Sequence, residues 1–244
     1  MIARIDCRFH SQILDLDVSM KVILPEHTTV PQKGFPTLYL LHGLSDDDSK
    51  WLRNTSLERY VEGRELAIVM PAANRSFYTN MEHGPDYFSY ISEEVPKVAR
   101  SFFPLSQERE DQYVAGLSMG GYGAFKVALT YPERFSAAAS LSGSLDIISR
   151  IDSFPKDFAY IFGNRPIQGT KDDLYSLIDQ LTEEGVSLPK LYQACGTEDH
   201  NYQANREFYQ YGKQSGLNIV FEEGTGGHEW EYWDQQIKQV LEFL

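Results

Sequence analysis

Apolar and polar residues alternate along the first part of the chain. Residues 3–10 and 14–24 each place apolar side chains at every second position, as Leu16, Val18 and Met20 illustrate. A period of two is typical of a β-strand that has one face against a core. The two segments follow one another closely, so we predict that they pair as antiparallel strands.

From residue 36 onward, short apolar runs alternate with longer amphipathic stretches. The short runs lack a period of two, which is typical of strands covered on both faces of a sheet. We therefore expect an α/β protein with one doubly wound, mostly parallel sheet, antiparallel N-terminal strands and helices on both faces. The expected strands are residues 37–41, 66–70, 112–115, 135–141, 188–194 and 217–221, and the expected helices are residues 52–62, 88–102, 121–131, 172–184, 201–214 and 230–244.

The segment of residues 144–170 does not follow this alternation of short apolar runs and amphipathic stretches. Residues 144–170 contain Phe154-Pro155 and a Gly163-to-Pro166 turn, and no repeat or linker divides the chain. Long irregular segments in compact domains often form lids or pocket walls. We expect a single domain over residues 1–244, in which residues 144–170 make an excursion across the top of the sheet.

Charge and cysteine content narrow the function classes. The chain of 244 residues carries a formal net charge of −13, which disfavours binding to nucleic acid or to an anionic membrane. The N-terminus has no apolar segment of the kind found in signal peptides. Cys7 and Cys195 are far apart in sequence, so we expect free thiols in a reducing compartment. These features predict a cytoplasmic protein.

The sharpest motif is G-L-S-M-G at residues 116–120. It follows an apolar run and precedes a helical stretch, which is the context that a G-x-S-x-G nucleophile turn requires. Gly116 and Gly120 would remove side chains that collide with the adjacent strand and helix, and Ser118 would stand exposed above the sheet. The alternative is a glycine-rich turn that only packs a helix closely. We interpret Ser118 as the candidate nucleophile.

A serine nucleophile needs a base and a group that orients the base. In this kind of fold the acid and then the histidine follow the serine, which leaves His200 and His228. His228 lies in a glycine-rich loop before the last helix and is the better candidate. Asp199, in a loop after the preceding strand, is the candidate acid, with Glu198 as competitor.

Acyl transfer also needs backbone N–H groups that hold the oxyanion. We expect these donors to be Met119, directly after the serine, and Leu44, in the His42-Gly43-Leu44 loop after an early strand. His42 would hold this loop rather than act as a base. The acidic residues 46–48 lack the spacing of a calcium loop, so we expect a solvated loop there and neither a metal nor a cofactor.

These motifs together resemble the esterase D family of α/β-hydrolases. The similar segments are L-L-H-G-L at residues 40–44, G-L-S-M-G-G-Y-G-A at 116–124, G-T-E-D at 196–199 and Gly227-His228, and the likeness is greatest to the tributyrin esterases of Gram-positive bacteria. The resemblance implies Ser118, Asp199 and His228 as a catalytic triad and Leu44 and Met119 as the oxyanion hole. It also implies a preference for short acyl chains and, in several members, a homo-oligomer.

The resemblance leaves the substrate open. A carboxylesterase for acetyl to butyryl esters is expected; the alternatives are an S-formylglutathione hydrolase-like thioesterase, a feruloyl or acetyl-xylan type esterase, and a non-catalytic binding protein on the same fold. The formylglutathione branch usually carries a cysteine just after the early loop, where this chain has Ser45 followed by three aspartates. Four aromatic residues are candidates for the substrate pocket, namely Trp51, Phe77, Tyr78 and Trp230.

Overall fold

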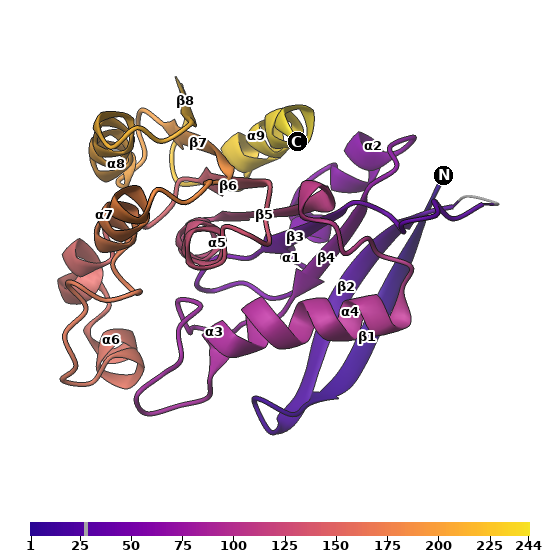
Figure 1. The fold of residues 1–244 in the computed structure, drawn as a ribbon, viewed down its shortest axis with the longest axis horizontal. Helices are drawn as coiled ribbons and strands as arrows, with labels where there is room; N and C mark the ends of the chain where they lie inside the picture. Colours follow the sequence, from indigo (N-terminus) through magenta and orange to yellow (C-terminus); the bar gives the residue numbers. More distant parts are fainter. Residues whose placement is uncertain (27–28) are drawn as a thin grey trace.

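A single twisted sheet of eight strands forms the centre of the molecule (Figure 1). The structure is a computed structural model and describes residues 1–26 and 29–244. The strand order is β1-β2-β4-β3-β5-β6-β7-β8. The strands are β1 (Ile2–Ser11), β2 (Leu16–Pro25), β3 (Thr37–Leu41), β4 (Ala67–Pro71), β5 (Gln112–Leu117), β6 (Ala137–Leu141), β7 (Lys190–Gly196) and β8 (Ile219–Gly224).

The first two strands form the antiparallel hairpin that the alternating pattern predicts. Their register runs from Ile2 opposite Pro25 to Ser11 opposite Leu16. β2 then pairs antiparallel with β4, and each later neighbour in the sheet pairs in parallel. The predicted fold class is therefore confirmed. Because β3 to β8 are parallel, their carboxyl ends meet at one edge of the sheet.

Helices follow most of the strands and cover both faces of the sheet. α4, α5, α7 and α8 contribute to one buried cluster, whereas α1, α2 and α9 contribute to another. The elements are α1 (Lys50–Asn54), α2 (Leu57–Val61), α3 (Tyr87–Ser89), η1 (Tyr90–Glu94), α4 (Val95–Phe102), η2 (Arg109–Asp111), α5 (Met119–Thr130), η3 (Ile148–Ser153), α6 (Pro155–Ile161), α7 (Leu174–Glu184), α8 (Tyr202–Gln214) and α9 (Trp230–Phe243).

Two hydrophobic cores lie on opposite faces of the sheet. Within β3, Tyr39 and Leu41 belong to one core, and Leu38 and Leu40 belong to the other. Successive side chains of a strand point to opposite faces, so a strand covered on both faces must be apolar at every position. This explains why β3 reads as an uninterrupted apolar run. Because both faces of β3 are covered, the loop that follows this strand begins from a fixed position.

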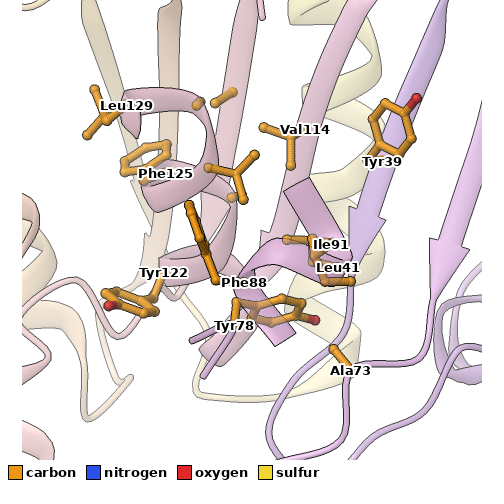
Figure 2. Close-up of a cluster of buried hydrophobic side chains, with 14 of the residues drawn as sticks. Tyr39, Leu41, Ala73, Tyr78, Phe88, Ile91, Val114, Tyr122, Phe125 and Leu129 are labelled. Carbon is orange, nitrogen blue, oxygen red and sulfur yellow. The ribbon is translucent and has the colours of Figure 1, made fainter. Parts of the chain in front are cut away.

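Figure 2 shows part of the core beneath α5. Tyr122, Phe125 and Leu129 of α5 are fully buried there together with Phe88. α5 is thus apolar nearly all round and lies in the interior of the molecule. A helix buried in this way holds its first turn, next to Ser118, in a fixed position.

The structure divides the helix expected over residues 52–62 into α1 and α2. Thr55 between them is extended, with φ −132° and ψ 168°. Its hydroxyl donates to the carbonyl of Trp51 at 2.5 Å and accepts from the N–H of Leu57 at 3.2 Å. A threonine hydroxyl can thus replace backbone bonds and end a helix, which apolar periodicity alone does not reveal.

The helix expected over residues 88–102 is continuous but contains a wider π-helical turn, η1. Pro96 lies just after this turn and has no N–H, so the carbonyl of Ser92 cannot receive the usual helical bond. The guanidinium of Arg134 donates to that carbonyl instead. The proline therefore explains the change of helix type.

The segment over residues 144–170 contains η3 and α6 and lies away from the β1–β2 hairpin (Figure 1). Phe158 of α6 packs against Phe77, with their ring centroids 5.3 Å apart. Within the described part of the chain, no helix has both the length and the apolar character needed to cross a membrane.

Candidate active site

Ser118 occupies the sharp turn between β5 and α5. Its backbone has φ 53° and ψ −116°, a left-handed conformation that is strained for a residue with a side chain. A Cβ on Gly116 would lie 2.3 Å from the carbonyl oxygen of Gly120, and one on Gly120 would lie 2.5 Å from that of Leu41. The two glycines therefore let β3, β5 and α5 approach closely enough to form this turn.

The loop between β8 and α9 brings His228 to Ser118. His228 Nε2 lies 3.0 Å from Ser118 Oγ, and Nδ1 lies 2.9 Å and 3.1 Å from the two carboxylate oxygens of Asp199. A carboxylate accepts hydrogen bonds, so it selects the tautomer with the proton on Nδ1. Nε2 is then an acceptor for the hydroxyl proton of Ser118.

Asp199 lies at the carboxyl end of β7 and is buried, whereas its neighbour Glu198 is exposed. Burial acts to raise the pKa of Asp199, but hydrogen bonds from His228 and from the N–H of Asn201, at 2.7 Å, outweigh it and leave the pKa below its ordinary value. The carboxylate is therefore ionised at neutral pH. The structure brings Asp199, and not Glu198, to the His228 ring.

His200 lies beside this group, with its ring centroid 4.3 Å from that of His228. Burial, together with the nearby His228, lowers the pKa of His200. Asp199, His200 and His228 also offer ligand atoms within 4.8 Å of one another, the one such cluster among the described residues. A metal ion bound there would compete with the bond between Asp199 and His228.

The sequence did not single out the residues that hold this arrangement. The indole N–H of Trp233 donates to the Ser142 hydroxyl at 3.0 Å. The Trp233 and His228 rings also pack edge to face, with their centroids 4.9 Å apart. The side-chain amide of Asn201 donates to the carbonyl of Ser142 at 3.0 Å. Trp233 lies one turn beyond Trp230 on α9, so the two side chains share a face of the helix. Had α9 been drawn as a helix starting just after His228, this spacing could have indicated Trp233 as a neighbour of the site.

The loop after β3 is held by His42. The N–H of Ala73 donates to its Nε2 at 2.9 Å, so Nδ1 carries the proton and donates to the carbonyl of Gly43 at 2.7 Å. Burial lowers the pKa of His42, which keeps the ring neutral. Leu44 follows in this loop and lines the cavity beside Ser118. Met119 is the first residue of α5, where a backbone N–H has no partner within the helix.

Trp51 and Tyr78 do not line that cavity, which corrects their assignment as pocket residues. Both side chains are fully buried. The indole of Trp51 donates to the carbonyl of Leu41 at 3.0 Å, and the hydroxyl of Tyr78 donates to that of His42 at 2.9 Å. Their polar atoms thus satisfy the carbonyls of Leu41 and His42 at the end of β3, and neither side chain lines the cavity.

Of the acidic residues 46–48, Asp47 is exposed as expected, whereas Asp46 and Asp48 are less solvated than the sequence indicates. Asp46 accepts from the N–H of Gly43 at 3.2 Å and lines the cavity. Asp48 is only 7% exposed, and the Lys21 ammonium lies 3.8 Å from it. Asp46 therefore helps to hold the loop after β3.

A cavity of about 430 Å³ opens above Ser118 and His228. Phe77 and Trp230, two of the four candidate pocket residues, line it, and Arg150 and Phe154 from residues 144–170 complete the wall. A hydroxyl, an imidazole and a buried carboxylate in hydrogen-bond sequence can activate the hydroxyl as a nucleophile. The cavity provides space for a substrate next to that hydroxyl.

Comparison with known proteins gives likenesses over the whole chain. The family model described as "Putative esterase" matches residues 11–244. An acetyl esterase of Caldicellulosiruptor saccharolyticus is 33% identical over 97% of this chain and 96% of its own length. FphF, a fluorophosphonate-binding serine hydrolase of Staphylococcus aureus, is 38% identical with a TM-score of 0.94, over 99% of this chain and 98% of that one. The S-formylglutathione hydrolase FrmB of the same organism is 38% identical with a TM-score of 0.91, over 100% and 98%.

Proposed function

The chain belongs to the family described as "Putative esterase" and is a serine carboxylesterase, and we propose that it hydrolyses esters of short acyl groups through a covalent acyl-enzyme on Ser118. The observation that carries the proposal is the line of hydrogen bonds from Ser118 through His228 to Asp199. A buried, ionised carboxylate at the end of that line suits the formation of an imidazolium.

In the first half of the reaction, His228 Nε2 takes the hydroxyl proton of Ser118 as Oγ attacks the ester carbonyl carbon. A new C–O bond forms and the carbonyl π electrons move to the oxygen. The oxyanion accepts hydrogen bonds from the N–H groups of Leu44 and Met119. The C–O bond to the alcohol then breaks, and the imidazolium returns its proton to the departing oxygen.

In the second half, a water molecule replaces the alcohol. His228 takes a proton from the water as it attacks the acyl carbon, and the same N–H groups hold the second oxyanion. The bond to Ser118 Oγ breaks, the proton returns to Oγ, and the carboxylic acid leaves. Asp199 keeps its charge throughout and stabilises the imidazolium in both halves.

Short acyl chains are the proposed substrates for two reasons. The acetyl esterase relative is similar over nearly its whole length. The cavity, of about 430 Å³, is bounded by the rings of Phe77, Phe154 and Trp230, and it lies toward the small end of the roughly 300–1,000 Å³ typical of ligand pockets. We also propose that the chain is a single domain in which residues 144–170 form part of the pocket wall, and that its substrates resemble those of tributyrin esterases.

A thioesterase is the second candidate, because the FrmB structure is described as an S-formylglutathione hydrolase. The chemistry above applies unchanged to a thioester, with a thiol as the leaving group. The absence of a cysteine after the 40–44 loop disfavours this activity.

A panel of p-nitrophenyl esters and S-formylglutathione tests these proposals. We expect kcat/KM to be highest for acetyl and butyryl esters and at least about tenfold lower for decanoyl, since a pocket too short for the chain loses the binding free energy of several methylenes. The Ser118→Ala protein supplies the background rate. Equal or faster hydrolysis of the decanoyl ester would contradict the short-chain proposal, and a higher kcat/KM for S-formylglutathione would favour the thioesterase.

A further inference from the structure

Arg150 of η3 lies in the wall of the cavity that contains Ser118 and His228. The guanidinium stacks over the ring of Phe154, 5.3 Å from its centroid. Its Nε is buried and has no hydrogen-bond partner within the described part of the chain. Burial also lowers the pKa of Arg150, although the charge of Asp199 acts in the opposite direction.

The other arginine of the cavity provides a contrast. Arg75 forms two parallel hydrogen bonds to Asp157, from Nε at 2.8 Å and from Nη2 at 2.7 Å. This bidentate pair neutralises Arg75 and ties the loop after β4 to α6. Arg150 has no such carboxylate bonded to it among the described residues, although the charge of Asp199 acts on it from a distance.

The buried Nε–H of Arg150 is costly without a bonded acceptor, because the protein removes its hydration and supplies nothing in return. The cost is notable in a chain whose net charge is −13, where carboxylates are abundant. A bound anionic group would supply the missing acceptors, and a guanidinium fork matches two coplanar oxygens. Asp46 also lines the cavity and would repel a doubly charged phosphate more than a singly charged carboxylate.

We propose that Arg150 binds a carboxylate of the substrate, so that the preferred esters carry a carboxylate on their acyl or alcohol part. This proposal rests on the hydrolysis proposed above. Arg150 is a specificity residue in it and takes no part in the proton transfers of Ser118 and His228. The guanidinium compensates the charge of the substrate while the ester lies at Ser118.

Two matched substrate pairs test the proposal and distinguish the two parts of the substrate. On the alcohol side, 4-acetoxybenzoate is compared with its methyl ester. On the acyl side, p-nitrophenyl hemisuccinate is compared with p-nitrophenyl butyrate, after subtraction of the rate without enzyme. The measured quantity is kcat/KM for the carboxylated ester divided by that for its neutral partner, which cancels intrinsic changes in turnover.

In Arg150→Gln we expect this ratio to fall about 10- to 100-fold for at least one pair, as loss of a charge-assisted hydrogen bond implies. Arg150→Lys should retain part of the preference for the carboxylated ester, because lysine keeps the positive charge but cannot form two parallel hydrogen bonds to a carboxylate. Arg206→Gln, which removes an exposed arginine from α8, is the matched control. A ratio unchanged by Arg150→Gln for both pairs would overturn the proposal.

A binding measurement separates failure of this proposal from failure of the proposed hydrolysis. The affinity of the Ser118→Ala protein for 4-acetoxybenzoate and for its methyl ester, measured by calorimetry, needs no turnover. We expect Arg150→Gln in that background to weaken binding of the carboxylate about tenfold or more relative to the methyl ester. Equal weakening of both ligands would show a structural role and overturn the carboxylate site, whether or not the protein is an esterase.

Discussion

Replacing Ser118 by alanine is expected to lower kcat for p-nitrophenyl acetate by about 10,000-fold or more, because the acyl-enzyme can no longer form. The folded state should be nearly unaffected. The change removes one hydroxyl whose hydrogen bond in the structure is to His228 Nε2 at 3.0 Å, and the left-handed backbone of residue 118 is as accessible to alanine as to serine.

Thermal unfolding and far-ultraviolet circular dichroism should therefore match those of the wild-type protein. Ser101→Ala, the same substitution at an exposed position on α4, is the matched control and should retain wild-type kcat. A Ser118→Ala protein that still hydrolyses the ester at more than a tenth of the wild-type rate would rule out Ser118 as the nucleophile.

Asp199→Asn is expected to lower kcat by about 1,000- to 10,000-fold with a small change in KM, as loss of the orienting acid does in serine hydrolases. An amide can donate a hydrogen bond to Nδ1, which would move the ring proton to Nε2 and leave no acceptor for the Ser118 hydroxyl. It also removes the charge that stabilises the imidazolium. Glu198→Gln, the same carboxyl-to-amide change on the exposed neighbour, should keep kcat within about threefold.

Asp199→Asn should also change how the stability of the folded protein depends on pH. The pKa of Asp199 is lower in the folded than in the unfolded protein, so the ionised carboxylate stabilises the folded state above the unfolded pKa, and this contribution is lost as pH falls through the folded pKa. The difference in Tm between wild type and Asp199→Asn should thus be largest near neutral pH and shrink toward acid. A difference that grows on acidification, or a Glu198→Gln enzyme as impaired as Asp199→Asn, would contradict the assignment.

The local parts of this architecture could be predicted from the sequence because each rests on short-range chemistry. The G-x-S-x-G turn needs two glycines at fixed offsets from Ser118, and both are visible in a pentapeptide. A strand covered on both faces, such as β3, must be apolar throughout, so its run of residues predicts its place in the sheet. The order of strands and helices then follows from the alternation of such runs.

The burial of individual side chains, and the contacts between residues remote in sequence, could not be predicted in this way. Trp51 and Trp230 are the same residue type and their rings pack edge to face 5.3 Å apart, but only Trp230 lines the cavity. Which side of a loop a ring occupies depends on contacts that are remote in sequence. Ser142 and Trp233, 91 residues apart, meet for the same reason. Arg150, whose guanidinium has no carboxylate bonded to it among residues 1–26 and 29–244, could not be recognised either, because a sequence does not show which carboxylates lie out of reach.

The proposed hydrolysis requires that His228 and Asp199 activate Ser118 for attack on the acyl carbon of an ester. Labelling with a fluorophosphonate, followed by intact-mass and peptide mass spectrometry, tests it most directly, because such a probe forms a stable bond only with an activated nucleophile. We expect one adduct per chain, located on the peptide that contains Ser118, with labelling absent in Ser118→Ala and strongly slowed in His228→Ala. No adduct on the wild-type protein, or an adduct on another residue, would contradict it.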